Sequence, residues 1–185
     1  MTRDGFWALV ERSLAVAASL PAPRRGLLRR RVALRPGERH LLALEQLLQA
    51  LPDEELVSFQ EHLDALRAGL LSWDVWGAGH VACGGMGDDT FTDFCTWLVS
   101  QGRAAYERVA ADPDALADVA PPDLDERIGD AETWGYAALE VWDGRHDEDM
   151  PRPGVGGSVP AGEEWDEDDA EGLATRYPRL SARYA

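Results

Sequence analysis

Apolar residues recur every three or four positions in the segment 56–70, and this spacing constrains the fold more strongly than any other feature of the chain. The positions concerned are Leu56, Phe59, Leu63, Leu66 and Leu70. Residues three and four apart lie on one face of an α-helix, so the simplest cause of the pattern is a helix that buries this face in a core. Pro52 and the three acids that follow it suit the first turn of such a helix, because carboxylates interact favourably with the helix dipole there.

Similar spacing predicts helices in most of the chain, whereas no segment alternates apolar and polar residues over the length of a strand. We therefore expect an all-α fold with about six or seven helices in a compact domain that spans residues 1–142. The expected helices cover residues 4–20, 38–50, 52–70, 88–101 and 103–111, a short piece near 117 and part of 121–142.

The chain after residue 142 has a different composition. Proline and glycine are frequent in 143–164, which predicts a linker. The acidic run 163–169 suits the N-terminal turn of a helix, so residues 165–185 are expected to form a short C-terminal helix or tail. Because Trp165 is embedded in this acidic run, the segment is also suited to dock on a basic partner.

The formal net charge of −16 is unevenly distributed along the chain. Seven Arg residues lie within 24–39, which we expect to be an exposed insertion, whereas most of the 34 acidic residues follow it. An acidic domain repels the phosphates of nucleic acid, so general nucleic-acid binding is not expected. Two alternatives remain for the Arg-rich stretch: it contacts nucleic acid or an acidic partner, or it lies against the acidic surface of this chain.

All 18 basic residues are Arg. Because Lys is absent, reactions that form a Schiff base with the chain are excluded, and so are a pyridoxal-phosphate lysine and a P-loop lysine. No segment indicates a cofactor, and none is expected.

The N-terminal apolar stretch does not have the form of a secretory signal peptide, because Asp4, Glu11 and Arg12 carry charge within it. The chain has no run of about 18 apolar residues, so no membrane span is expected. A disulfide-rich secreted scaffold would need more cysteines than Cys83 and Cys95. These observations favour a cytoplasmic protein with free thiols.

The most distinctive segment reads Trp73-Asp74-Val75-Trp76-Gly77-Ala78. Further motif positions are Phe6-Trp7, Leu51-Pro52, Phe59, Gly84-Gly85, Asp88-Asp89, Phe91, Phe94, Trp97-Leu98, Gly102-Arg103 and Asp112-Pro113-Asp114. Together these motifs resemble a bacterial domain of unknown function, DUF4240, over roughly residues 2–142. Tyr177-Pro178-Arg179-Leu180 is similar to the tails of its actinobacterial members. The resemblance implies a helical domain with no established activity.

Two features depart from the pattern of that family. The stretch 24–39 looks like an insertion between the first two helices, and His80 and Cys83 are not part of the motif. Chemistry that depends on His80 or Cys83 would therefore be peculiar to this protein.

Ionisable residues cluster within and after the motif, and they are the candidate catalytic residues. They are Asp74, His80, Asp88, Asp89 and Arg103. In a functional interpretation, carboxylates and His80 act as acid and base while Arg103 binds an anionic group, or the aspartates meet a metal or a cationic ligand. In a structural interpretation, Asp88 or Asp89 caps a helix and Arg103 pairs with an acid between helices.

Two further sets of residues also have both a functional and a structural interpretation. A weak candidate for a zinc site or a Cys-His nucleophilic pair consists of His80, Cys83 and Cys95. Its structural alternative is a buried free cysteine beside a packed or exposed histidine. A candidate ligand pocket consists of Trp73, Trp76 and Trp97. Its structural alternative is that these tryptophans fill the core.

The sequence contains no complete catalytic set, which favours a non-catalytic binding or regulatory module. Such a module would contact a protein or a small ligand through its acidic helical surface or a Trp-lined cleft. The alternative is an enzyme of unassigned substrate in a bacterial biosynthetic or modification pathway, using the Asp, Arg and His cluster between residues 74 and 103. A third hypothesis is that the acidic domain mimics nucleic acid and binds a basic protein.

Overall fold

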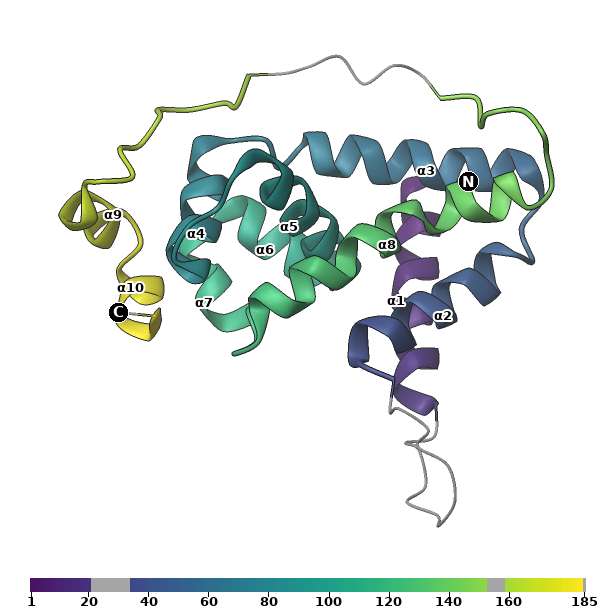
Figure 1. Ribbon diagram of the computed structural model, residues 1–185, viewed down its shortest axis with the longest axis horizontal. Helices are drawn as coiled ribbons and strands as arrows, with labels where there is room; N and C mark the ends of the chain where they lie inside the picture. Colours follow the sequence, from purple (N-terminus) through teal and green to yellow (C-terminus); the bar gives the residue numbers. More distant parts are fainter. Residues whose placement is uncertain (21–33, 153–158, 185) are drawn as a thin grey trace, which may run out of the picture.

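Figure 1 shows the computed structural model, which describes residues 1–20, 34–152 and 159–184. These residues form ten α-helices and one 3-10 helix, and they contain no β-strand. The helices are α1 (Arg3–Ser19), α2 (Pro36–Leu48), α3 (Asp53–Ala68), α4 (Trp73–Cys83), α5 (Asp88–Ser100), α6 (Arg103–Ala111), η1 (Pro113–Ala115, the 3-10 helix), α7 (Leu116–Val119), α8 (Leu124–Asp143), α9 (Ala170–Arg176) and α10 (Pro178–Tyr184).

The all-α prediction is confirmed, but the expected number of six or seven helices is too low. Helix α4 is missing from the expected helices, because its buried residues are mostly Gly and Ala and show no periodic spacing of large apolar side chains. The C-terminal segment forms two helices of seven residues each, α9 and α10, where one was expected, and helices this short contain too few turns to show a periodic apolar pattern. Among the described residues, no helix is both long enough and apolar enough to cross a membrane.

Helix α3 confirms the periodic pattern from which the fold was predicted. Pro52 precedes the helix, and three acids occupy its first turn. The buried residues of this face are Leu56, Phe59, Leu63 and Leu66, followed by Leu70 just beyond the end of the helix. The ring of Phe59 lies 4.8 Å from that of Phe6 in α1, measured between centroids. The face therefore packs into the core.

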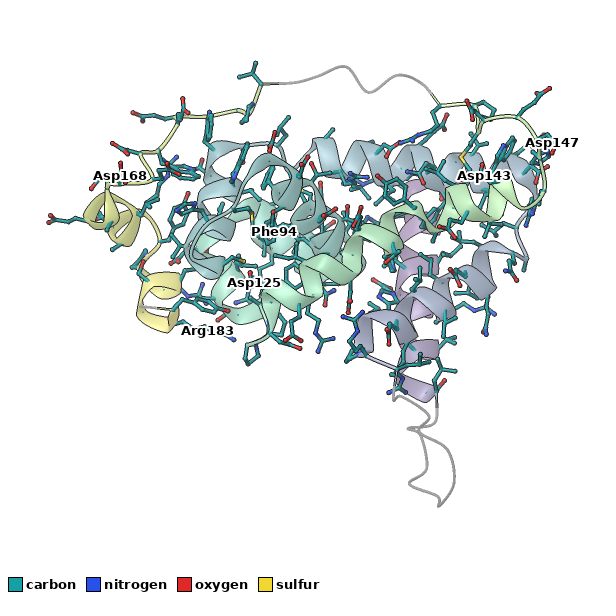
Figure 2. The ribbon with its side chains drawn as sticks, in the orientation of Figure 1. Phe94, Asp125, Asp143, Asp147, Asp168 and Arg183 are labelled. Atoms are coloured by element: carbon teal, nitrogen blue, oxygen red, sulfur yellow. The ribbon has the colours of Figure 1, made fainter. Side chains whose placement is uncertain are left out.

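Among the described residues, α8 is the longest helix, with 20 residues. It packs against α5 and also against α2 and α3 (Figure 1). Trp134 of α8 lies between two rings, with its centroid 5.6 Å from His40 of α2 and 6.3 Å from Phe59 of α3. Phe94 of α5 is fully buried in the interior of the domain (Figure 2).

The C-terminal residues 159–184 pack against the end of the domain that contains α4 and α7 (Figure 1). A short bridge joins the segment to the start of α4: the backbone N–H of Trp73 donates to the carbonyl of Ala161 at 2.8 Å. Three apolar side chains of the segment are buried against the domain, namely Leu173, Tyr177 and Leu180.

The helix expected at the acidic run 163–169 begins later than predicted. The run itself is not helical, and α9 begins at Ala170, where Asp169 accepts a hydrogen bond from the backbone of Gly172 at 2.9 Å. Acidic residues stabilise a first turn where a helix exists, but they do not start one alone. The run is held instead by Trp165, which bonds to the backbone of α4.

The linker predicted over 143–164 is not confirmed. Helix α8 includes the first residue of this range, and Arg145 donates hydrogen bonds to the carbonyls of Leu51 and Gln49 at 3.0 and 2.9 Å. Residues 153–158 lie outside the described residues. The beginning of the range is thus attached to the turn between α2 and α3.

The Arg-rich stretch 24–39 is described only in its last part, because residues 21–33 lie outside the described residues. Helix α2 begins at Pro36, two residues before the predicted start. Arg35 pairs with Asp130 of α8 at 2.7 Å. At this position an arginine of the stretch lies against an acid of the same chain.

Candidate functional site

The motif that contains Trp73 and Trp76 folds as the start of α4. Ser72 caps this helix, because its hydroxyl accepts a hydrogen bond from the backbone N–H of Val75 at 3.2 Å. Trp73 and Trp76 then lie on one helix face, and their rings stack with 5.4 Å between centroids and an interplanar angle of 16°. Phe91 of α5 stacks on Trp76 at 4.7 Å and 4°.

Trp165 of the C-terminal segment completes this group of rings. It meets Trp73 edge-on, with 6.1 Å between centroids and an angle of 90°, and its Nε1 donates to the carbonyl of Trp73 at 2.8 Å. Its ring also packs on His80, with 4.6 Å between centroids. Nε1 of Trp76 donates to the carbonyl of Met86 at 2.9 Å. These hydrogen bonds to the backbone fix the orientation of the indoles of Trp76 and Trp165.

An open space lies beside these rings, and we call it the aromatic–acidic hollow. Its lining residues are Trp73, Trp76, Met86, Glu164, Trp165, Asp166 and Glu167. Among the described residues, the three carboxylates of the hollow have no salt-bridge partner. Aromatic faces and carboxylates both attract positive charge, so the hollow is suited to a cationic group.

Contacts with α4 hold the C-terminal segment in position beside the hollow. The hydroxyl of Tyr177 donates to the carbonyl of Asp74 at 2.9 Å, and Nε of Arg176 donates to the Asp74 carboxylate at 2.9 Å. The close approach requires glycine at position 77. A Cβ on Gly77 would overlap the Tyr177 hydroxyl and lie 2.8 Å from Nε1 of Trp165.

Asp74 and Arg103, two of the candidate catalytic residues, are held in separate ion pairs. Asp74 pairs with Arg176 of the C-terminal segment. Arg103 begins α6 and pairs with Glu107 at 2.7 Å and with Asp4 of α1 at 2.9 Å. The pair between Arg103 and Asp4 joins α6 to α1, as the structural interpretation expects.

Asp88 and Asp89 both lie in the first turn of α5 and are exposed. The residue at the cap position is Gly87, so the prediction that one of the two aspartates caps the helix is wrong. The chain enters the helix one residue earlier than expected, and the carboxylate of Asp88 accepts a hydrogen bond from the backbone N–H of Asp89 at 3.0 Å. His80 lies elsewhere, against Trp165.

The cysteines have environments that suppress ionisation. Burial raises the pKa of Cys83 to about 12, with a further contribution from a hydrogen bond to Asp125 (labelled in Figure 2), and burial raises the pKa of Cys95 to about 12. Both thiols are therefore protonated at neutral pH, whereas the thiolate is the nucleophile and the metal ligand. Within the described ranges no three His, Cys, Asp or Glu side chains are grouped to hold a metal ion.

Trp97 lies apart from Trp73 and Trp76. Its side chain is buried, and it lines a second cavity together with Trp134, between α1, α2, α5 and α8. The three tryptophans predicted to line one pocket are thus divided between two sites.

Family membership follows from the part of the chain that forms α1 to α8. A sequence model described as a protein of unknown function (DUF4240) matches residues 1–143, which is more than half of the chain. The chain belongs to the DUF4240 family. No curated protein and no solved structure matches it. Trp73 and Trp76 lie inside the part matched by DUF4240, whereas Trp165 and the three carboxylates of the hollow lie beyond it.

Sequence reasoning did not connect Trp165 of this DUF4240 protein with Trp73 and Trp76. Trp165 follows Trp73 by 92 residues in the sequence. No local pattern predicts that the C-terminal segment folds back onto α4. The local signal is the single tryptophan within an acidic run, for which docking on a basic partner was one of two expectations. Its ring packs on α4 of the same chain. The structure adds the position of that tryptophan.

Proposed function

We propose that the protein is a non-catalytic binding module that recognises a Lys or Arg side chain of a basic polypeptide in the aromatic–acidic hollow. One observation carries the proposal: the indoles of Trp73 and Trp165 meet at a right angle beside three carboxylates that have no salt-bridge partner among the described residues. A cation placed in this corner meets aromatic rings and carboxylates at once.

Two physical effects favour a cation in the hollow. A cation over an aromatic face gains about 0.5–1 kcal/mol at an exposed site and about 2 kcal/mol when water is excluded. The net charge of −16 also attracts a basic partner and speeds its association. Salt screens interactions between exposed charges, so we expect the affinity to fall as ionic strength rises.

The positions of the ionisable candidates support binding over catalysis. An acid–base mechanism needs its groups within hydrogen-bond reach of one substrate. Asp74 and Arg103 instead pair with different partners, and Asp88 and Asp89 are exposed on the first turn of α5. No two of these side chains form a hydrogen bond with each other among the described residues.

Calorimetric titration with an acetylated tetra-arginine peptide at low salt measures how much the three carboxylates of the hollow contribute to binding. The variant replaces the three acids, as Glu164→Gln, Asp166→Asn and Glu167→Gln. An exposed ion pair contributes roughly 0.5 kcal/mol to the binding free energy. The loss of three ion pairs with the peptide is therefore expected to weaken binding about tenfold.

The matched control removes three charges at the other end of the molecule, as Asp147→Asn, Glu148→Gln and Asp149→Asn. These acids are exposed, and Figure 2 shows Asp147 at the opposite end from Asp168, a neighbour of the hollow residues in sequence. The control is expected to change the affinity less than twofold. Equal weakening by the two triple variants would mean that only the overall charge attracts the peptide, and it would refute the proposal.

A further inference from the structure

A second cavity, of about 350 Å³, lies between α1, α2, α5 and α8. The residues that line it all precede the three carboxylates of the hollow in the sequence. Its volume falls in the range of small-molecule sites. Two large aromatic side chains, Trp97 and Trp134, form part of its wall, together with small apolar residues such as Ala17 and Ala131. Such a wall suits a flat apolar group.

The polar part of the same wall carries guanidinium groups. Asp130 is paired with Arg35 at 2.7 Å, and Arg127 is paired with Asp123 at 2.9 Å, so these charges compensate one another. Arg39 donates to the carbonyl of Leu20 and has no carboxylate partner among the described residues. One positive charge of the cavity wall is therefore uncompensated, in a chain whose net charge is −16.

His40 adds a polar but uncharged group to the cavity wall. Its Nε2 lies 2.7 Å from the hydroxyl of Ser13, and that hydroxyl donates to the carbonyl of Val10 at 2.7 Å. Since Ser13 donates its hydroxyl proton to the carbonyl of Val10, Nε2 of His40 must carry the imidazole proton and donate it to the Ser13 oxygen. Burial lowers the pKa of His40 to about 4, so the ring is neutral at pH 7. The charge available to a ligand is thus that of Arg39.

We propose that this cavity binds a small carboxylate with an aromatic or other flat apolar body, with the carboxylate at Arg39 and the body against Trp97 and Trp134. A guanidinium is well matched to a carboxylate because it offers two parallel N–H donors. The site is independent of the aromatic–acidic hollow, since the two have no lining residue in common. A negative binding result at one site therefore does not affect the proposal for the other site.

Phenylacetate is the probe, and phenylacetamide is the matched neutral ligand of nearly the same shape. Both are titrated into the full-length protein while the indole N–H signals of Trp97 and Trp134 are followed by NMR. A ligand of this size is expected to bind with a Kd of roughly 1 mM. We expect the amide to bind at least fivefold more weakly, because it cannot pair with the charge of Arg39.

Arg39→Gln is expected to weaken phenylacetate binding to the level of the amide. Arg12→Gln removes the same charge from an exposed position of α1 outside the cavity and is expected to leave the affinity unchanged. Equal affinity for acid and amide, or equal effects of the two substitutions, would overturn the proposal.

Ala17→Leu provides a test that does not depend on the fold of the Arg39 variant. Ala17 lies on the cavity wall in α1, and leucine is a good helix former, so the larger side chain is expected to fill the cavity without loss of thermal stability. Binding of both ligands should then disappear. Unchanged binding of phenylacetate by this variant would place the ligand elsewhere and contradict the proposal.

Discussion

Replacing Gly77 by alanine is expected to destabilise the docked C-terminal segment by roughly 1–3 kcal/mol, the usual cost of overpacking a close contact. The added Cβ would overlap the hydroxyl of Tyr177 and lie 2.8 Å from Nε1 of Trp165. Neither group can withdraw freely, because each donates a hydrogen bond to a carbonyl of α4, at Asp74 and Trp73 respectively. The substitution therefore disrupts both attachments at once.

Hydrogen exchange of the backbone amides in α9 and α10 measures this effect. We expect exchange in both helices to accelerate in Gly77→Ala while amides in α3 and α8 keep their protection. Gly129→Ala is the matched control, since Gly129 lies within α8 and nothing lies within 4 Å of an added Cβ. It is expected to be neutral or to stabilise the protein by up to about 1 kcal/mol. Unchanged exchange of α9 and α10 in Gly77→Ala would show that the contact tolerates a side chain.

The same substitution is expected to weaken binding of tetra-arginine. Trp165 and the three carboxylates of the hollow belong to the C-terminal segment, so release of this segment separates them from Trp73 and Trp76. Affinity and protection of α9 should therefore fall together. An affinity that stays at the wild-type level while α9 loses protection would show that the hollow is not the binding site.

Lowering the pH from 7 to 4 is expected to cost roughly 3 kcal/mol of stability through His40 alone. His40 is 7 % exposed, and burial lowers its pKa from 6.5 to about 4. Below pH 6.5 the unfolded chain binds a proton at His40 whereas the folded protein does not, so unfolding becomes more favourable. The loss accumulates until the pH reaches the folded-state pKa.

Urea unfolding of the wild type and of His40→Gln, at intervals between pH 7 and pH 4, isolates this contribution from that of the carboxylates. Gln retains an N–H donor for the hydroxyl of Ser13 but does not titrate. We expect the wild type to lose about 3 kcal/mol more than the variant over this interval. Parallel pH profiles for the two proteins would show that His40 is not buried in its neutral form.

The parts of the fold that local patterns determine are those that the sequence predicted. The apolar spacing from Leu56 to Leu70 corresponds to the buried face of α3, and the absence of alternating segments corresponds to the all-α fold. These features depend on residues within a few turns of one another. Periodicity in one segment is enough to report them.

The parts that the sequence did not predict depend on residues far apart in the chain. Helix α10 begins where Asp114 accepts hydrogen bonds from the backbone of Arg179 and Leu180, both at 3.0 Å. Because the capping residue Asp114 belongs to η1, no residue next to α10 in the sequence predicts this cap. Trp165 likewise contributes to the hollow only because its indole reaches the carbonyl of Trp73. Long-range contacts of this kind leave no periodic trace.

An NMR titration of the indole N–H signals with acetylated tetra-arginine tests the proposed binding site most directly. The chain has seven tryptophans, so each ring reports on a known place in the fold. We expect concerted, saturable shifts with one binding constant for Trp73, Trp76 and Trp165, and little change for Trp7, Trp97, Trp134 and Trp142. Shifts spread evenly over all seven signals, or absent from the three indoles of the hollow, would contradict cation recognition at this site.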